Sequence, residues 1–477
     1  MSLLLDKYGS EVQITEEVVE AAVQNSTAAA DVMGILIDER GDDIRITEKI
    51  VEMAVLNEWS GAEVMDLLLD RRGDEVRNTE ENVQLAMMNS RSGAGVIMSL
   101  LKRRGHDVHI TEQVLIFAAA HGSWTRRLRY GLLDLILDHR MKEAEPTEDV
   151  AYAAAGNHYN GVHQISLLLE RFGDAVPITE RVLEASVWNH NCGNQVTALL
   201  LNRRGDNIQI TERVVNVAVQ NEDCGDRVMA VLFQGQGDNI PITEQVLISA
   251  AQNQKCGNRI LEILFDRCGD DIPITNDIVH SAASNRGCGD KTMTVLLERR
   301  RDIKITKNVL KATIWNPGCG DKVVAAILDN RGDINFQDGE YDDDLQTASL
   351  YGHQVIVQML LGKKIDVNAQ GGWLGNALQA ASCQGHTKIV QMLLDNNAAV
   401  NAQGGEYNTA LQAASYGGYV GIVQTLLNNN ADVNAQGGSS GNALQAASFQ
   451  GHTKIVQMLL DNNADVNAPG GFYGGSL

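Results

Sequence analysis

The sequence predicts an all-α solenoid, a fold in which short helix pairs stack one on the next. The segment ITEEVVEAAVQN (14–25) returns nine more times with a 32-residue step, apart from one step of 36 and a last step of 31. A second unit, with a 33-residue period, follows from about residue 335. Aromatic residues make up only 5% of the chain, as in folds built from small and aliphatic side chains. Self-similarity at such a period is the signature of a repeat array.

Composition and charge bound the class of protein. The chain has 477 residues, of which 44% are hydrophobic and 21% are charged. Its 61 acidic and 39 basic residues give a formal net charge of −22. Because such a field repels polyphosphate, we expect no nucleic-acid partner. No apolar run approaches the ~18 residues of a membrane span, and Asp6 comes too early for a signal peptide. We therefore expect a soluble, cytoplasmic protein without membrane partners.

The first helix of each 32-residue unit is expected to begin after a threonine. A threonine hydroxyl can accept a hydrogen bond from a free N–H group of the first turn. The glutamate that usually follows lies where the helix dipole favours an anion. Small residues such as Ala22 and Ala54 let this helix pack closely against its neighbours. The ten threonines are Thr15, Thr47, Thr79, Thr111, Thr147, Thr179, Thr211, Thr243, Thr275 and Thr306.

The second helix of the unit carries a stripe of leucines. In AEVMDLLLDRRG (62–73) the stripe is followed by arginines, which suit the negative end of the helix dipole. Gly73 then fits a left-handed helix cap. One such pair cannot bury both of its faces, but pairs stacked about 8–10 Å apart form a continuous core.

The 33-residue unit has a different pattern. NAQGGEYNTALQAASYGGYVGIVQTLLNNNADV (401–433) recurs from Asn368 and Asn434, with a degenerate copy from Asn335. These units resemble ankyrin repeats, which implies a helix–turn–helix followed by a hairpin. They depart from the usual pattern in having NALQ in place of a Thr-Pro-Leu-His turn. They also have Asn397 and Asn430 where glycine is usual, and asparagine tolerates that left-handed position.

These patterns predict two arrays. Residues 1–334 form about ten 32-residue helix pairs, which continue into an ankyrin repeat domain of about four repeats at residues 335–477. The 32-residue units look like the companion repeats of fungal ankyrin-repeat proteins, including the sensor arrays of fungal NOD-like receptors. This resemblance implies a surface for recognition and no chemistry.

The usual catalytic signatures are missing from the sequence. It has no phosphate-binding loop, no dinucleotide-binding glycine motif, no zinc-protease motif and no nucleophile elbow. We therefore expect no cofactor. Cys192, Cys224, Cys256 and Cys288 recur at the same position of successive 32-residue units. Equivalent positions of stacked repeats lie about 10 Å apart, beyond the ~7 Å limit between bridged Cα atoms. We interpret these cysteines as small, half-buried loop residues and expect no metal site.

One loop is longer and more basic than its counterparts. HGSWTRRLRYGLL (121–133) holds four extra residues between the two helices of the fourth repeat. Insertions on one face of a solenoid commonly build its binding face, and tryptophan, tyrosine and arginine are typical of binding hot spots. The alternative is a drifted repeat with a long solvated loop. The candidate binding residues here and in the next loop are Trp124, Arg126, Arg127, Arg129, Tyr130 and Tyr159.

A variable stripe also runs along the first helices. Positions that change from repeat to repeat while their neighbours stay fixed are not core positions, and we expect them to line the concave surface that receives partners. Ile116, Tyr152 and Trp188 fall together in the middle of this stripe.

We expect a non-catalytic recognition or scaffold solenoid that binds a protein or peptide through its middle repeats. The alternative is an enzyme with a small-molecule pocket in repeats 4–6, in which His121, His158, His163 and Tyr152 would move protons. A closed pocket with convergent histidines would favour the enzyme, and an open groove the binding module. Neither end has an evident polar capping repeat, which predicts fraying or end-to-end self-association.

Overall fold

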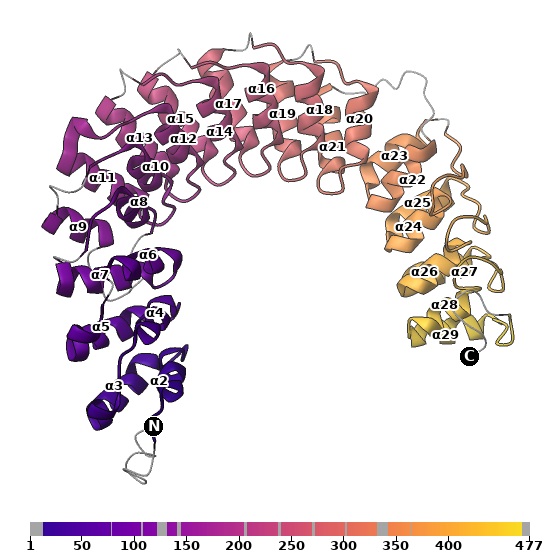
Figure 1. Cartoon of the computed structure of the whole chain (residues 1–477). Coiled ribbons are helices and arrows are strands. Elements are labelled where there is room, and N and C mark those ends of the chain that lie inside the picture. The colour runs from indigo at the N-terminus through magenta and orange to yellow at the C-terminus, as the bar shows by residue number, and fades with distance from the viewer. Residues whose placement is uncertain are drawn as a thin grey trace. The chain divides into compact units, whose positions relative to one another are not determined.

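The computed structural model describes residues 13–77, 79–105, 108–121, 131–140, 145–204, 208–236, 240–269, 272–300, 303–331, 342–363 and 365–469. Its internal contacts divide the chain into two units, Met1–Pro241 and Ile242–Leu477. Each unit is a stack of antiparallel helix pairs, and the described residues contain no β-strand (Figure 1). The predicted all-α solenoid is therefore confirmed.

In the first unit, the first helix of each pair begins at or just after the repeated threonine. The second helix begins at a glycine in most pairs. The first helices are α2 (Glu16–Val23), α4 (Glu48–Leu56), α6 (Thr79–Met88), α8 (Glu112–Ala120), α10 (Glu148–Gly156), α12 (Glu180–Trp188) and α14 (Glu212–Gln220). The second helices are α3 (Ala29–Arg40), α5 (Gly61–Arg72), α7 (Gly93–Arg104), α9 (Leu132–Arg140), α11 (Gly161–Phe172), α13 (Gly193–Arg204) and α15 (Gly225–Gln236).

The second unit contains helix pairs of both kinds. Pairs of the 32-residue type are α16 (Glu244–Gln252) with α17 (Gly257–Cys268), α18 (Asn276–Ser284) with α19 (Gly289–Arg299), and α20 (Lys307–Ile314) with α21 (Gly320–Arg331). Pairs of the 33-residue type are α22 (Asp342–Tyr351) with α23 (Gln354–Leu361), α24 (Ala377–Gln384) with α25 (Thr387–Asp395), α26 (Ala410–Gly417) with α27 (Val420–Asn428), and α28 (Ala443–Phe449) with α29 (Thr453–Asp461).

The repeated threonines act both within and between repeats. The hydroxyl of Thr179 accepts from the N–H of Val182 at 3.4 Å, as a helix cap does. The same hydroxyl donates to the carboxylate of Glu148, one repeat earlier, at 2.5 Å. Thr47 makes only the bond to the earlier repeat, donating to Glu16 at 3.0 Å, and has no side-chain cap bond. The glutamates Glu16, Glu148 and Glu180 at helix starts are thus also acceptors for the following repeat.

The second helix ends differently from the prediction at Gly73. Its φ of −53° and ψ of −38° are right-handed, and the chain continues into the short 3₁₀ helix η3 (Gly73–Glu75). Arg104 of the next repeat donates to the carbonyl oxygens of Gly73 at 2.6 Å and Val76 at 2.8 Å. The left-handed cap was wrong because an arginine from the neighbouring repeat satisfies the carbonyl groups at this end.

An asparagine at the end of most first helices joins consecutive repeats, and we call this series of bonds the asparagine ladder. The side-chain amide of Asn189 donates to the carbonyl oxygens of Ala155 at 3.0 Å and Asn157 at 2.9 Å, both one repeat earlier. Its own oxygen accepts from the N–H groups of Asn191 and Cys192, so the loop is held as well. Equivalent bonds to the preceding repeat are made by Asn57, Asn89, Asn157, Asn221, Asn285 and Asn316.

The fourth repeat has His121 at this asparagine position. Its Nδ1 lies 3.0 Å from the carbonyl oxygen of Phe117, in the same repeat. Its ring stacks on the Phe117 ring with centroids 4.1 Å apart. The asparagine ladder is therefore interrupted at His121.

The two repeat types meet within the second unit. The carboxylate of Asp321, at the start of α21, accepts from the N–H groups of Val355 and Ile356 in the first turn of α23. Further along, Asn397 and Asn430 adopt φ of 65° and 60°, which confirms the left-handed positions expected of them. Within the described residues, no helix is both long enough and apolar enough to cross a membrane.

Candidate binding groove

An open groove of about 620 Å³ lies on the face that the first helices form in the middle of the first unit. It extends over α8, α10, α12 and α14, and therefore over four consecutive repeats. The residues that line it are Ile116, Ala120, Asp149, Tyr152, Ala153, Gly156, Asn157, Arg181, Glu184, Ala185, Trp188 and Val217.

The hollow exists because two consecutive repeats carry a very small residue at one position of the first helix. Ala120 and Gly156 occupy this position, and Met88 and Trp188 occupy it in the repeats on either side. Met88 and Trp188 are both exposed. A Cβ atom added to Gly156 would meet only the Cβ of Ala185, at 3.9 Å. A larger side chain at Gly156 would therefore extend into the groove.

Tyr152 and Trp188 are the two aromatic side chains of the groove, with 41% and 47% of their surface exposed. The guanidinium carbon of Arg181 lies 4.4 Å from the centroid of the Tyr152 ring, a cation–π arrangement. Arg181 also pairs with Asp149, and this hydrogen bond raises the pKa of Arg181 above its ordinary value. Arg181 is thus a fixed positive charge on one wall.

The charged groups of the lining are paired with each other or with near neighbours. Glu184 pairs with Arg213 at 2.8 Å, as Asp149 does with Arg181. By contrast, the Tyr152 hydroxyl and the Trp188 indole N–H have no hydrogen-bond partner among the described residues. Both side chains are exposed, so that their polar groups face solvent. These two groups are therefore free to bond with a ligand.

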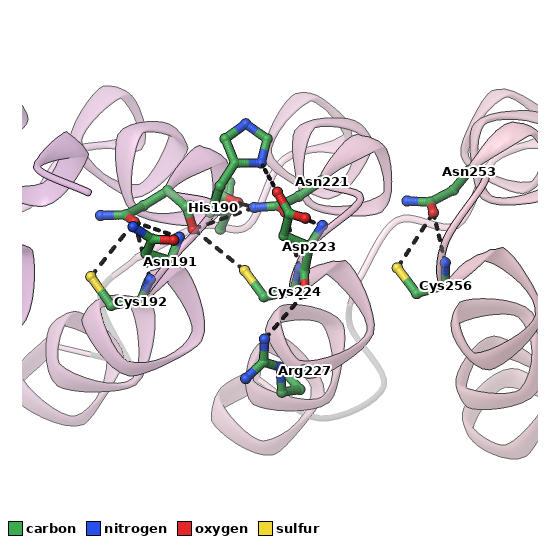
Figure 2. Close-up of polar contacts among 11 residues, drawn as sticks. His190, Asn191, Cys192, Asn221, Asp223, Cys224, Arg227, Asn253 and Cys256 are labelled. Atoms are coloured by element: carbon green, nitrogen blue, oxygen red, sulfur yellow. Dashed lines mark hydrogen bonds and ion pairs between the residues drawn. The ribbon is translucent and has the colours of Figure 1, made fainter. Parts of the chain in front are cut away.

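Two histidines continue the aromatic surface from Trp188. The His190 ring lies edge-on to Trp188, with centroids 5.1 Å apart. The His158 ring lies 5.8 Å from the His190 ring at an angle of 30°. Nδ1 of His190 lies 3.1 Å from a carboxylate oxygen of Asp223, and Figure 2 shows this contact at the top of the loop. His190 thus links the groove residue Trp188 to the loops.

The structure brings together the predicted stripe residues Ile116, Tyr152 and Trp188, all of which line the groove. Tyr159 is exposed on the loop before α11 and is not part of the lining. The loop residues Trp124, Arg126, Arg127, Arg129 and Tyr130 lie outside the described residues, and their role stays a prediction.

The residues of the enzyme alternative do not converge on the groove. Tyr152 lines it, whereas His121, His158 and His163 do not. Nε2 of His163 lies 2.8 Å from a carboxylate oxygen of Asp134, a contact between the second helices α11 and α9. His121 contacts its own helix, as described above. The groove therefore holds one of the four side chains proposed for proton transfer.

The recurring cysteines are hydrogen-bond donors inside the stack. The thiol of Cys224 donates to the carbonyl oxygen of Asn189 at 3.4 Å, and that of Cys319 donates to Asn285 at 2.8 Å. Figure 2 shows the bond from the Cys224 sulfur to this carbonyl oxygen as a dashed line. Ser92 makes the same bond to Asn57 at 2.6 Å. Serine and cysteine are thus alternative donors at one position.

The cysteines are also more deeply buried than the sequence suggested. Cys192 is half-buried as expected, but Cys224, Cys256, Cys288 and Cys319 are buried. Burial raises the pKa of the Cys224 and Cys319 thiols, which opposes thiolate chemistry. No group of three or more potential metal-ligating side chains gathers in the described parts of the chain.

Sequence reasoning missed two features of the site. The asparagines that join the repeats had no assigned role, although their recurrence at one position of the repeat was the available signal. Arg181 was not a candidate either, because only the structure brings it over Tyr152 of the preceding repeat.

The fold and groove define a class, the helical-repeat solenoid with an open groove on the face of its first helices. Ten segments match the family model described as domain of unknown function (DUF7104): residues 3–33, 35–65, 67–96, 100–125, 135–163, 167–196, 199–229, 231–260, 263–293 and 295–323. They cover more than half of the chain, which therefore belongs to this family. Residues 312–404 and 400–469 match ankyrin repeats (3 copies), which confirms the ankyrin part. A comparison with curated proteins found no match.

Proposed function

We propose that this protein is a non-catalytic recognition scaffold that binds a protein or peptide in the groove over α8, α10, α12 and α14. The observation that carries the proposal is the pair of exposed aromatic side chains, Tyr152 and Trp188, beside an open hollow with a small-residue floor. Aromatic anchors beside a hollow are typical of binding hot spots. The ankyrin repeats support the same class of function, since such repeats generally mediate protein–protein interaction.

The size of the groove fits a segment of a partner. Its lining spans three steps between adjacent repeats, from Ile116 to Val217. At roughly 10 Å a step, this is about 30 Å, the length of about nine residues of extended chain. The free Tyr152 hydroxyl and Trp188 N–H could bond to the backbone of such a segment. We propose that the arrays at 1–334 and 335–477 act as one cytoplasmic sensor or scaffold, as the likeness to fungal NOD-like receptor arrays implies.

A random nonapeptide library displayed on phage and selected on the full chain tests the proposal. We expect enriched peptides whose binding falls at least about tenfold with Trp188→Ala or Tyr152→Ala, the loss typical of a hot spot. Gly156→Leu should block the same peptides by filling the groove, without removing any polar group.

Trp315→Ala is the matched control. Trp315 is 57% exposed and occupies the Trp188 position of a later repeat, outside the groove. Peptides that bind equally well to the parent, Gly156→Leu and Trp188→Ala proteins would place recognition elsewhere and refute the proposal.

A further inference from the structure

We propose that the groove recognises a basic peptide segment that inserts one bulky aliphatic or aromatic side chain between Tyr152 and Trp188. This inference rests on the proposed function and names the chemistry of the partner. Three observations carry it: the charge of the helices that line the groove, the way their carboxylates are held, and the apolar floor.

The helices that line the groove are acidic. Helices α8, α10, α12 and α14 together carry six acidic residues and two basic residues, a net charge of −4. The two basic residues, Arg181 and Arg213, are already paired with Asp149 and Glu184. Both positive charges of these helices are therefore neutralised by carboxylates of the same helices, and the net charge that a partner meets is negative.

Two of the remaining carboxylates are held at the helix starts by neutral groups. Glu148 accepts from the hydroxyl of Thr179, and Glu180 accepts from the hydroxyl of Thr211. A hydroxyl donor positions a carboxylate without cancelling its charge. Each of these carboxylates directly precedes a lining residue, Glu148 before Asp149 and Glu180 before Arg181. Because they are fixed one repeat apart, they match lysine or arginine side chains spaced along a peptide.

The floor of the groove requires an apolar group. Ala120, Ala153 and Ala185 contribute methyl groups, with Gly156 between them. The side-chain amide of Asn157, which also lines the groove, already donates to the carbonyl oxygens of Ala119 and Ala120. A polar side chain placed against these methyl groups would lose its hydration without gaining a hydrogen bond from them, at a cost in binding. An aliphatic or aromatic side chain would fill it.

The nonapeptide library also tests this inference. The informative set consists of peptides enriched on the parent protein but not on Gly156→Leu. We expect this set to carry an excess of lysine and arginine and one bulky apolar residue. A synthetic member should bind the Glu148→Gln/Glu180→Gln double variant several-fold more weakly, because glutamine keeps an acceptor for the threonine hydroxyl but removes the charge. Its binding should also become less sensitive to salt.

Glu16→Gln/Glu17→Gln is the matched control, since it removes two charges at the start of α2 and leaves the groove intact. An equal effect of both double variants would show a long-range effect of net charge and overturn the inference. Groove-dependent peptides that are neutral or acidic would also overturn it, while leaving the proposed function standing. The absence of any groove-dependent peptide would refute both.

Discussion

Arg181 lies over the ring of Tyr152 from the preceding repeat and pairs at the same time with Asp149, three residues before that tyrosine. One cation therefore covers an aromatic face of the groove and neutralises one of its carboxylates. Since the groove is otherwise acidic, Arg181 acts against the binding of a second cation at this wall.

Replacing Arg181 with methionine should therefore strengthen the binding of a basic peptide. The substitution leaves Asp149 unpaired and uncovers the Tyr152 ring, and we expect affinity to rise several-fold at low salt and less at high salt. The free energy of unfolding should change by less than about 1 kcal/mol, because the ion pair is exposed. Fluorescence anisotropy of a labelled groove-dependent peptide measures the affinity. A weaker complex would instead mean that Arg181 contacts the peptide directly.

Replacing Asn189 with alanine should destabilise the first unit. The change removes the donor to the carbonyl oxygens of Ala155 and Asn157 and leaves the N–H groups of Asn191 and Cys192 without their acceptor. Asn189 is fully buried, so we expect a loss of about 2–4 kcal/mol. Urea unfolding measures the loss, and hydrogen exchange should accelerate in the loop. The exposed neighbour Gln195, changed to alanine, serves as control, and equal stability of both variants would contradict the role of the ladder.

The buried cysteines should resist alkylation. Burial raises the pKa of the Cys224 and Cys319 thiols, so that less thiolate is present at neutral pH than in an ordinary cysteine. We expect iodoacetamide to modify the exposed Cys268 first and the two buried thiols only when the stack opens. Mass spectrometry of protein treated for increasing times gives the order, and urea-unfolded protein is the control. Early modification of Cys319 would show that the donor position is accessible in the folded chain.

The contact between α21 and α23, where His353 precedes α23 and lies beside Gly320, should weaken as the pH falls. His353 is 4% exposed, and burial lowers its pKa below the ordinary value of 6.5, although the carboxylate of Asp321 acts in the opposite direction. The neutral form is thus favoured in the folded state, while the unfolded chain takes up a proton at about its ordinary pKa. The free energy of unfolding therefore decreases as the pH falls below 6.5, because the unfolded chain binds a proton at this histidine more readily than the folded one does. Well above pH 6.5, His353 causes no change.

His353→Gln isolates this dependence. Between pH 7.5 and 5.5 we expect the parent to lose up to about 1 kcal/mol more than the variant, measured by urea unfolding of both proteins. Asp344 has the opposite sign, because burial raises the pKa of its carboxyl group above the ordinary 3.8. Its contribution to stability is therefore lost as the pH rises from 3.8 toward the raised pKa. Identical pH profiles for parent and variant would exclude His353 as the source.

Much of the fold could be predicted because the repeats of this one sequence can be aligned with each other. Thr179 and Trp188 stand at fixed distances within a unit, so helix starts and surface positions follow from spacing alone. The grouping of Ile116, Tyr152 and Trp188 was predictable for the same reason, since equivalent positions of stacked repeats lie side by side.

Contacts that depend on side-chain reach could not be predicted in this way. Gly73 has the sequence of a left-handed cap, but Arg104 from the next repeat supplies the bonds instead. Arg181 lies one repeat from Tyr152, and its stacking follows from rotamers that spacing does not specify. Asn189 was hidden for another reason: an asparagine before a loop is ordinary, and its role is visible only once the carbonyl groups of the previous repeat are beside it.

The interruption of the asparagine ladder at His121 bears on how the stack comes apart. In a repeat protein, stability is approximately the sum of the stabilities of the repeats and of the interfaces between neighbours. An interface without the asparagine bond is therefore a point at which unfolding can start or stop. His121 closes α8, the first helix of the groove, so this link lies at the groove's own margin. A ligand spread across α8, α10, α12 and α14 would fasten these repeats to one another and leave those before α8 to open on their own. In a pulling experiment on the ligand-bound protein, the first three repeats should then unfold at a lower force than the repeats that hold the ligand.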